Sequence, residues 1–113
     1  MKSKIVSLSK NKDFKNLLEG KKRSNKYFTL FFKKLVNKNS KSLNISFVTK
    51  KKLGNAVKRN KIKRRLKNMT NEAVKKKFTN FNYSYLVIAK NTVFNDDYAN
   101  IKKTLFSDFE RIK

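Results

Sequence analysis

The apolar residues of this 113-residue chain form two helical stripes and three short runs of strand-forming residues. In the middle of the chain they recur at i, i+4, i+7 and i+11, which places them along one side of an α-helix: Ile62, Leu66, Met69 and Ala73. Near the C-terminus they recur every three or four residues: Tyr98, Ile101, Leu105, Phe109 and Ile112. Both stripes predict amphipathic helices that turn their apolar sides to the core.

Residues beside these stripes suit helix ends. Asn55 can accept a hydrogen bond from a free amide of the middle helix, and Gly54 can take a positive φ at an abrupt strand-to-helix junction. Asn95 is the expected N-cap of the last helix, with Asp96 and Asp97 in its first turn, where carboxylates complement the helix dipole.

The N-terminal part predicts one more helix. Ser9 can cap a short helix over Lys10–Glu19, and Gly20 follows at a good stopping position. Its small apolar side consists of Phe14, Leu17 and Leu18. Residues 1–8 before it are expected to be a loose basic lead-in.

Three runs rich in aromatic and β-branched residues predict strands: Tyr27–Leu35, Leu43–Lys50 and Tyr83–Ala89. The second is expected to form a hairpin with the first, and the third, which is the most hydrophobic, to be a central strand. Lys21–Lys26 is interpreted as a basic connector. The order helix, strands, helix, strand, helix predicts a single α+β domain, a small two-layer sandwich spanning residues 1–113.

The first predicted strand has two unlike faces. One is entirely apolar and should face the core: Phe28, Leu30 and Phe32. The other is mixed and could stay partly open: Tyr27, Thr29 and Phe31. Aromatic side chains on an open sheet face beside basic charge would make a stacking platform for unpaired bases. A sheet buried on both faces is the alternative.

Charge narrows the class of partner. The chain has 31 Lys and Arg against 7 Asp and Glu, a net charge of +24, which favours a polyanion. Nucleic acid is the leading class, and an anionic membrane surface is second. The basic residues concentrate in residues 50–67, which contain three of the five arginines. Arg suits phosphate and base-edge contacts, although a solvated helix face is the plain alternative.

Composition argues against chemistry by the chain itself. There is no Cys and no His. The carboxylates are scattered, with Asp108 and Glu110 expected in solvent, so no cluster for two metal ions and no activated nucleophile is evident. No signal-peptide core and no apolar run of about 20 residues is present, and a cytoplasmic location without membrane contact is expected.

The run KKLGNAVKRNKIKR, from Lys51 to Arg64, resembles the signature of the bacterial ribonuclease P protein component. The family's characteristic Arg-Asn-Arg triplet stands here as Arg59-Asn60-Lys61, so the third position keeps its charge and loses the guanidinium fork. Lys50 stands where the family usually has Ser. The resemblance implies a βαβ crossover of the rare left hand, whereas the general rule predicts a right-handed one.

Members of this family form a complex with a large catalytic RNA that removes the 5′ leader of precursor tRNA with bound Mg²⁺. The resemblance therefore implies a subunit of an endoribonuclease in which the RNA is the catalyst. No catalytic or metal-binding side chain is assigned to this chain, and no obligate protein partner is inferred. The residues implied to bind the RNA subunit, or to help order its metal site, are Lys50, Lys51, Lys52, Asn55, Lys58, Arg59, Asn60, Lys61, Lys63, Arg64 and Lys67.

The resemblance also implies a cleft for the single-stranded leader. The Asp13-Phe14 pair matches the family's first helix, and Leu18 stands where some members have a second aromatic residue. The resemblance also favours an open sheet face over a sheet buried on both faces. The expected cleft therefore consists of Phe14, Leu18, Tyr27, Thr29 and Phe31. Two rivals remain: another small RNA-binding protein, such as a ribosomal protein, and a DNA-coating or membrane-surface protein.

Overall fold

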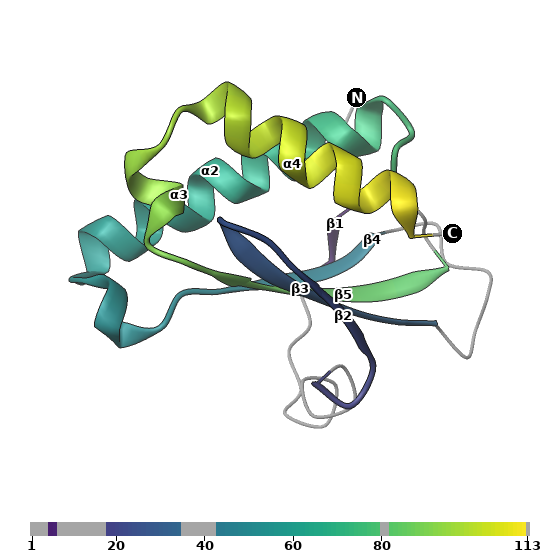
Figure 1. Cartoon of the computed structure of the whole chain (residues 1–113), viewed down its shortest axis with the longest axis horizontal. Coiled ribbons are helices and arrows are strands. Elements are labelled where there is room, and N and C mark those ends of the chain that lie inside the picture. Colours follow the sequence, from purple (N-terminus) through teal and green to yellow (C-terminus); the bar gives the residue numbers. More distant parts are fainter. Residues whose placement is uncertain (1–4, 7–17, 35–42, 80–81, 113) are drawn as a thin grey trace.

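The computed structural model describes residues 5–6, 18–34, 43–79 and 82–112. Its elements are β1 (Ile5–Val6), β2 (Lys21–Ser24), β3 (Phe28–Lys34), β4 (Leu43–Val48), the 3-10 helix η1 (Lys51–Leu53), α2 (Ala56–Lys75), β5 (Tyr83–Ala89), α3 (Thr92–Asn95) and α4 (Tyr98–Arg111). The strands form one sheet, and α2 and α4 lie side by side on one face of it (Figure 1). The predicted two-layer α+β sandwich is confirmed.

The strand order is β1-β4-β5-β3-β2, which confirms β5 as a central strand and shows that the predicted hairpin is wrong. β5 lies between the two strands that were expected to pair, antiparallel to β3 and parallel to β4. β3 and β4 each have an apolar side that must face the core. That requirement is met whether the two strands are neighbours or are separated by a third strand, so the pattern could not distinguish the two arrangements.

Two strands were not expected from the sequence. β2 lies within the predicted basic connector and pairs antiparallel with β3 at the edge of the sheet. β1 lies within the predicted loose lead-in and pairs parallel with β4 at the other edge. An edge strand needs only backbone hydrogen bonds on one side, so its side chains can be charged. The predicted helix over Lys10–Glu19, with Phe14 and Leu17, lies almost entirely outside the described residues.

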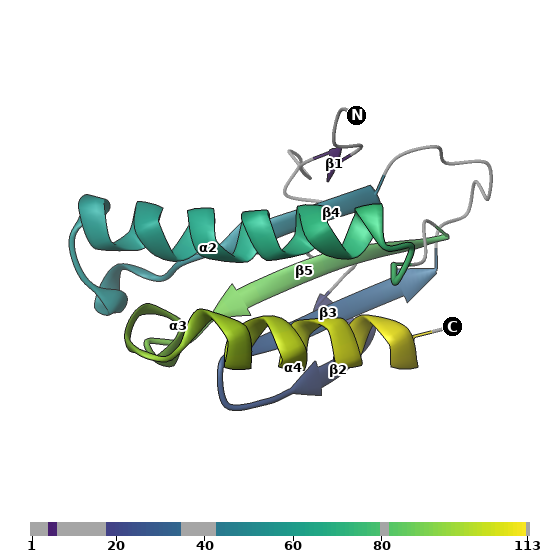
Figure 2. The same cartoon turned by 90° about the horizontal axis from the view of Figure 1, so that it is seen from above.

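The unit β4-α2-β5 crosses over with the left hand that the resemblance implied. Figure 2 views the sheet from the helix side, and both strands run from right to left in it. If this view is rotated until both strands point upward, β5 lies to the left of β4 and α2 passes in front of them. In a right-handed crossover with the helix in front, the second strand would lie to the right. The general preference for right-handed crossovers does not hold here.

The core lies between the helices and the sheet. The middle stripe is completely buried, as predicted: Ile62, Leu66, Met69 and Ala73. From the last stripe Ile101, Leu105, Phe109 and Ile112 are buried, and Tyr98 is half-buried. The sheet contributes residues of the predicted inward parity: Phe28, Leu30, Leu43 and Ile45.

The start of α2 agrees with the prediction in detail. The Asn55 side chain accepts a hydrogen bond of 2.9 Å from the Lys58 amide and so caps the helix. Gly54 has φ 139°, a conformation that other residues rarely adopt.

The start of α4 differs from the prediction. Asn95 ends the short helix α3 instead of capping the last helix, and Asp97 occupies the N-cap position without a side-chain capping bond. Neither Asp96 nor Asp97 lies in the first turn of α4. The Asp96 carboxylate is engaged by Tyr27 instead, so a tertiary hydrogen bond replaces the expected helix-dipole contact.

Candidate nucleic-acid interface

Helix α2 buries one side and presents the other as a basic surface. Of the predicted residues on the helix, Asn60, Lys61, Lys63, Arg64 and Lys67 are exposed, and Lys58 and Arg59 are half-buried. The approach to the helix is exposed as well at Lys50, Lys51, Lys52 and Asn55. The structure thus brings all eleven predicted RNA-subunit residues onto one element and the chain that leads into it. We call this the α2 surface.

The α2 surface is not neutralised by acidic side chains of the described residues. The ion pairs among the described residues join Arg23 to Asp108, Lys26 to Asp96 and Lys102 to Glu72. None of them uses a basic residue between positions 50 and 67. The lysines of this run, with Arg59 and Arg64, therefore make no ion pair among the described residues, and their charge suits the phosphates of a polyanion.

Arg65 belongs to the same run of charge and has a different role. It is half-buried, and its Nη1 and Nη2 atoms donate hydrogen bonds to the carbonyl oxygens of Phe94 (3.1 Å) and Asp96 (3.0 Å). Its guanidinium also lies 5.7 Å from the centroid of the Tyr98 ring. Arg65 therefore fastens α2 to the connection between α3 and α4.

A cavity of about 500 Å³ lies where η1 and the start of α2 meet β3 and the end of β5. We call it the junction pocket. It is lined by Thr29, Lys50, Lys52, Leu53, Lys58, Ile88, Ala89, Lys90 and Asn91. Four lysines and no carboxylate line it, so its chemistry suits an anion. Lys90 was not among the residues predicted from the sequence, although it directly follows the most apolar predicted strand.

The junction pocket continues onto the sheet face that lies away from the helices. Phe28 and Leu30 of β3 point into the core beneath the helices, so Thr29 and Phe31 point to the opposite face. Both are half-buried, and they lie opposite Ile88 and Leu86 of β5. An aromatic ring is thus partly open next to a basic pocket. Leu18, another predicted cleft residue, is 50% exposed, and Phe14 lies outside the described residues.

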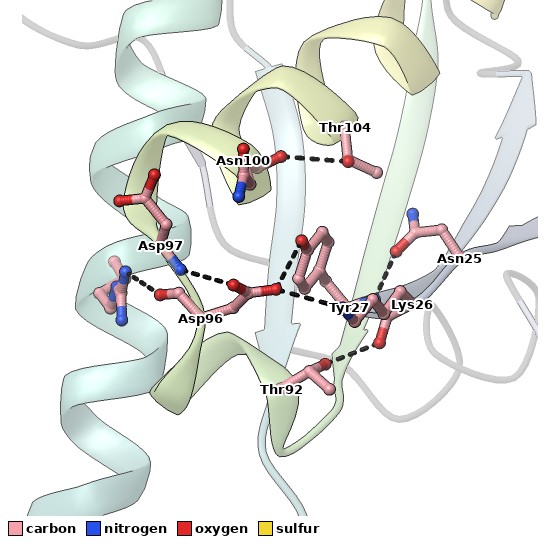
Figure 3. Close-up of polar contacts among 9 residues, drawn as sticks. Asn25, Lys26, Tyr27, Thr92, Asp96, Asp97, Asn100 and Thr104 are labelled. Atoms are coloured by element: carbon pink, nitrogen blue, oxygen red, sulfur yellow. Dashed lines mark hydrogen bonds and ion pairs between the residues drawn. The ribbon is translucent and has the colours of Figure 1, made fainter.

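Tyr27 does not lie on that face. Its side chain is buried, and its hydroxyl donates a hydrogen bond of 2.7 Å to Asp96 Oδ2 (Figure 3). This bond raises the pKa of Tyr27 and is the largest cause that lowers the pKa of Asp96. The Asp97 amide and Lys26 Nζ, 2.8 Å and 3.4 Å from the Asp96 carboxylate, lower its pKa further. Tyr27 therefore joins the sheet to the start of α4 and does not line the face with Thr29 and Phe31.

The described residues offer no metal site of their own. No three side chains of the metal-binding types Asp, Glu, His and Cys come together among them. Nor is any helix in the described part of the chain long and apolar enough to cross a bilayer.

Comparisons with known proteins agree over most of the chain. The family model described as Ribonuclease P matches residues 2–113. The ribonuclease P protein component of Carboxydothermus hydrogenoformans is 33% identical over 107 residues, which cover 91% of this chain and 87% of the relative. That of Streptococcus agalactiae is 31% identical over 103 residues, with 90% and 89% covered.

Solved structures give the same picture. The RNase P protein from Thermotoga maritima superposes with a TM-score of 0.80 at 25% identity, with 96% of this chain and 98% of that chain covered. The Staphylococcus aureus RNase P protein gives a TM-score of 0.74 at 28% identity, with 94% and 93% covered.

Proposed function

Because this chain belongs to the ribonuclease P protein family and is a protein subunit of that tRNA-processing endoribonuclease, we propose a separate role for each of its two surfaces. The α2 surface binds the RNA subunit of the enzyme. The junction pocket and the adjoining sheet face bind the single-stranded 5′ leader of precursor tRNA. Family membership favours this function over that of a generic basic RNA-binding protein.

The observation that carries the proposal is the position of the junction pocket. Lys50, Lys52 and Lys58 belong to the α2 surface, and they line the same cavity as Thr29 and Ile88 of the sheet. A strand of RNA that crosses the sheet would therefore pass directly to the surface proposed for the RNA subunit. Lys50, Lys52 and Lys58 would contact its phosphates, whereas the Lys90 ammonium already donates hydrogen bonds to the Asn25 carbonyl (2.6 Å) and to Ser24 Oγ (3.1 Å).

The sheet face suits a leader of variable sequence. Stacking of a base on an aromatic ring contributes about 1–3 kcal/mol and tolerates any base, because every base has a π-face. Phe31 offers such a ring, and Thr29 offers a hydroxyl beside it. An enzyme that processes many precursor tRNAs needs this tolerance.

In this proposal the phosphodiester bond is hydrolysed by the RNA subunit, which also holds Mg²⁺. The protein contributes binding and orientation. Its cations at the α2 surface lower the repulsion between the RNA subunit and the substrate, both of which are polyanions. Less Mg²⁺ should then be needed for cleavage.

The test is cleavage of precursor tRNA by a ribonuclease P RNA at low Mg²⁺, with substrates that carry either a long or a one-nucleotide leader. Arg64→Ala should weaken binding of the RNA subunit and reduce the salt slope of that binding by about 1. Phe31→Leu should raise KM about tenfold for the long leader only, as expected for the loss of one stacked base.

Lys103→Ala provides the control, because Lys103 is exposed on α4 and belongs to neither surface. It should match the wild type on both substrates. If Lys103→Ala and Arg64→Ala had equal effects, binding would be spread over the whole basic protein and the proposal would be wrong.

A further inference from the structure

We propose that Phe94 is a positioning residue for RNA binding, whose ring holds the ammonium groups of Lys58 and Lys61 as an ordered pair beside the junction pocket. The inference rests on the proposed function, because it assumes that these two lysines contact RNA. It adds a residue outside the basic run, on the short helix α3.

The geometry consists of two cations on one ring. Lys58 Nζ lies 4.8 Å and Lys61 Nζ 5.2 Å from the centroid of the Phe94 ring. Both distances are within the range of about 6 Å for attraction between a cation and the face of an aromatic ring. Lys58 also lines the junction pocket, so the ring fixes one of the pocket's own cations.

The pair needs such support. Lys58 and Lys61 are three residues apart on α2, where like charges on neighbouring turns repel each other. Free lysine side chains also occupy many rotamers, and this freedom is lost when they bind a phosphate. The negative face of an aromatic ring offsets the repulsion and narrows the rotamers before RNA arrives.

The backbone of α3 is held in place by contacts that do not use the Phe94 side chain. The Phe94 carbonyl accepts a hydrogen bond from Arg65, the neighbouring Val93 is completely buried, and Thr92 Oγ1 donates to the Lys26 carbonyl at 2.6 Å. The side chain of Phe94 can therefore be changed while α3 stays attached to α2 and β5.

A plain packing role is the competing explanation, because Phe94 is half-buried against the core. The two roles respond differently to fluorine. Replacing Phe94 by 4-fluoro-, 3,5-difluoro- and 3,4,5-trifluorophenylalanine keeps the ring's shape and apolar surface and progressively weakens its negative face. Packing tolerates this series, whereas cation attraction declines along it.

The experiment measures the affinity of the full-length protein for a ribonuclease P RNA at fixed salt. We expect affinity to fall stepwise along the fluorinated series and about three- to tenfold for Phe94→Leu, the range for partly exposed cation–π contacts. Phe94→Tyr should bind like the wild type. In the free protein, the ε-methylene protons of Lys58 and Lys61 should show ring-current shifts in NMR spectra that disappear in Phe94→Leu.

A variant that lacks both lysines separates this inference from the proposed function. If Lys58→Met combined with Lys61→Met leaves affinity unchanged, these lysines do not bind RNA and the functional assignment fails. If the double change weakens binding but the fluorinated series is flat in the wild type, Phe94 is only a packing residue and the inference is overturned. The inference is supported if RNA affinity falls stepwise along the fluorinated series in the wild type and no longer changes along it when Lys58→Met and Lys61→Met are present.

Discussion

Asp108 is the residue that fixes the turn between β2 and β3 to helix α4. Its side chain is 11% exposed, and it accepts hydrogen bonds from Arg23 Nε at 3.3 Å and Asn25 Nδ2 at 2.7 Å. Asn25 Oδ1 in turn accepts from the amides of Tyr27 and Phe28. One carboxylate therefore orders the chain that enters β3, the strand that carries Thr29 and Phe31.

Asp108→Ala should lower the free energy of unfolding by about 2 kcal/mol, because it leaves the partly buried Arg23 and Asn25 without their acceptor. Urea denaturation at constant ionic strength measures the change. Glu110→Ala is the matched control, since Glu110 is exposed on the same helix and its removal changes the net charge equally. Equal losses from both variants would show that net charge, and not the hydrogen bonds, matters.

The bond between Tyr27 and Asp96 predicts a pH dependence on the acid side. Because the folded state lowers the pKa of Asp96, its contribution to stability is complete above the unfolded pKa and is lost as pH falls from about 4 through the folded value. Tyr27→Phe removes the largest cause of that shift. The stability difference between wild type and Tyr27→Phe should therefore be largest near neutral pH and shrink below pH of about 4. A constant difference from pH 7 to pH 2.5 would contradict this assignment.

Part of this residue-level detail was present in the sequence. Asp108 lies three residues after Leu105 and four before Ile112, so the predicted stripe itself placed it on the buried side of the helix. The expectation that Asp108 lies in solvent ignored that pattern and was wrong, whereas Glu110 is exposed as expected. Arg65 follows the same logic, three residues after Ile62 and four before Met69, which separates it from the exposed Arg64.

At the scale of elements, the basic surface depends on how α2 begins. Gly54 has φ 139° and ψ −163°, which lets the chain turn sharply from η1 into the helix. Asn55 then caps the helix, and the Arg59 amide donates to the Asn55 carbonyl at 3.0 Å. The turn brings Lys50 and Lys52 into the lining of the junction pocket together with Lys58.

Gly54→Ala should destabilise the protein by about 1–3 kcal/mol, the cost of a non-glycine residue in such a conformation. The added methyl group would also lie 2.8 Å from Lys58 Cδ, so the Lys58 side chain would have to move. Thermal or urea unfolding measures the first effect, and affinity for the RNA subunit measures the second. Val57→Ala, at a position 79% exposed, is the control and should change stability by less than about 0.5 kcal/mol.

The elements themselves were predicted unequally. Periodicity identified α2, α4 and the buried sides of β3 and β4, because burial leaves a pattern along the chain, and β5 was predicted from its run of apolar residues. It could not show that β5 separates β3 from β4, because pairing depends on residues far apart in sequence. It missed β2, whose Lys21, Lys22 and Arg23 have no apolar pattern, because backbone bonds to β3 and polar contacts such as Arg23 with Asp108 hold that edge strand.

At the scale of the whole molecule, the net charge of +24 opposes compaction. The longest extent of the fold is 37 Å. At about 0.01 M salt the Debye length is about 30 Å, so nearly every charge acts on every other; at about 0.1 M it is about 10 Å and only neighbours interact. The described residues contain three ion pairs to offset this repulsion, two of them through an exposed or half-exposed carboxylate.

The free protein should therefore gain stability as salt rises over this range, as measured by urea unfolding in NaCl. Screening alone depends on ionic strength, whereas Lys50, Lys52 and Lys58 of the junction pocket should also bind a multivalent anion directly. Sulfate should then stabilise more than NaCl at equal ionic strength, and Lys50→Met combined with Lys52→Met should remove that excess while keeping the response to NaCl. Equal effects of the two salts on the wild type would mean that the pocket contributes only to the general field and binds no anion of its own.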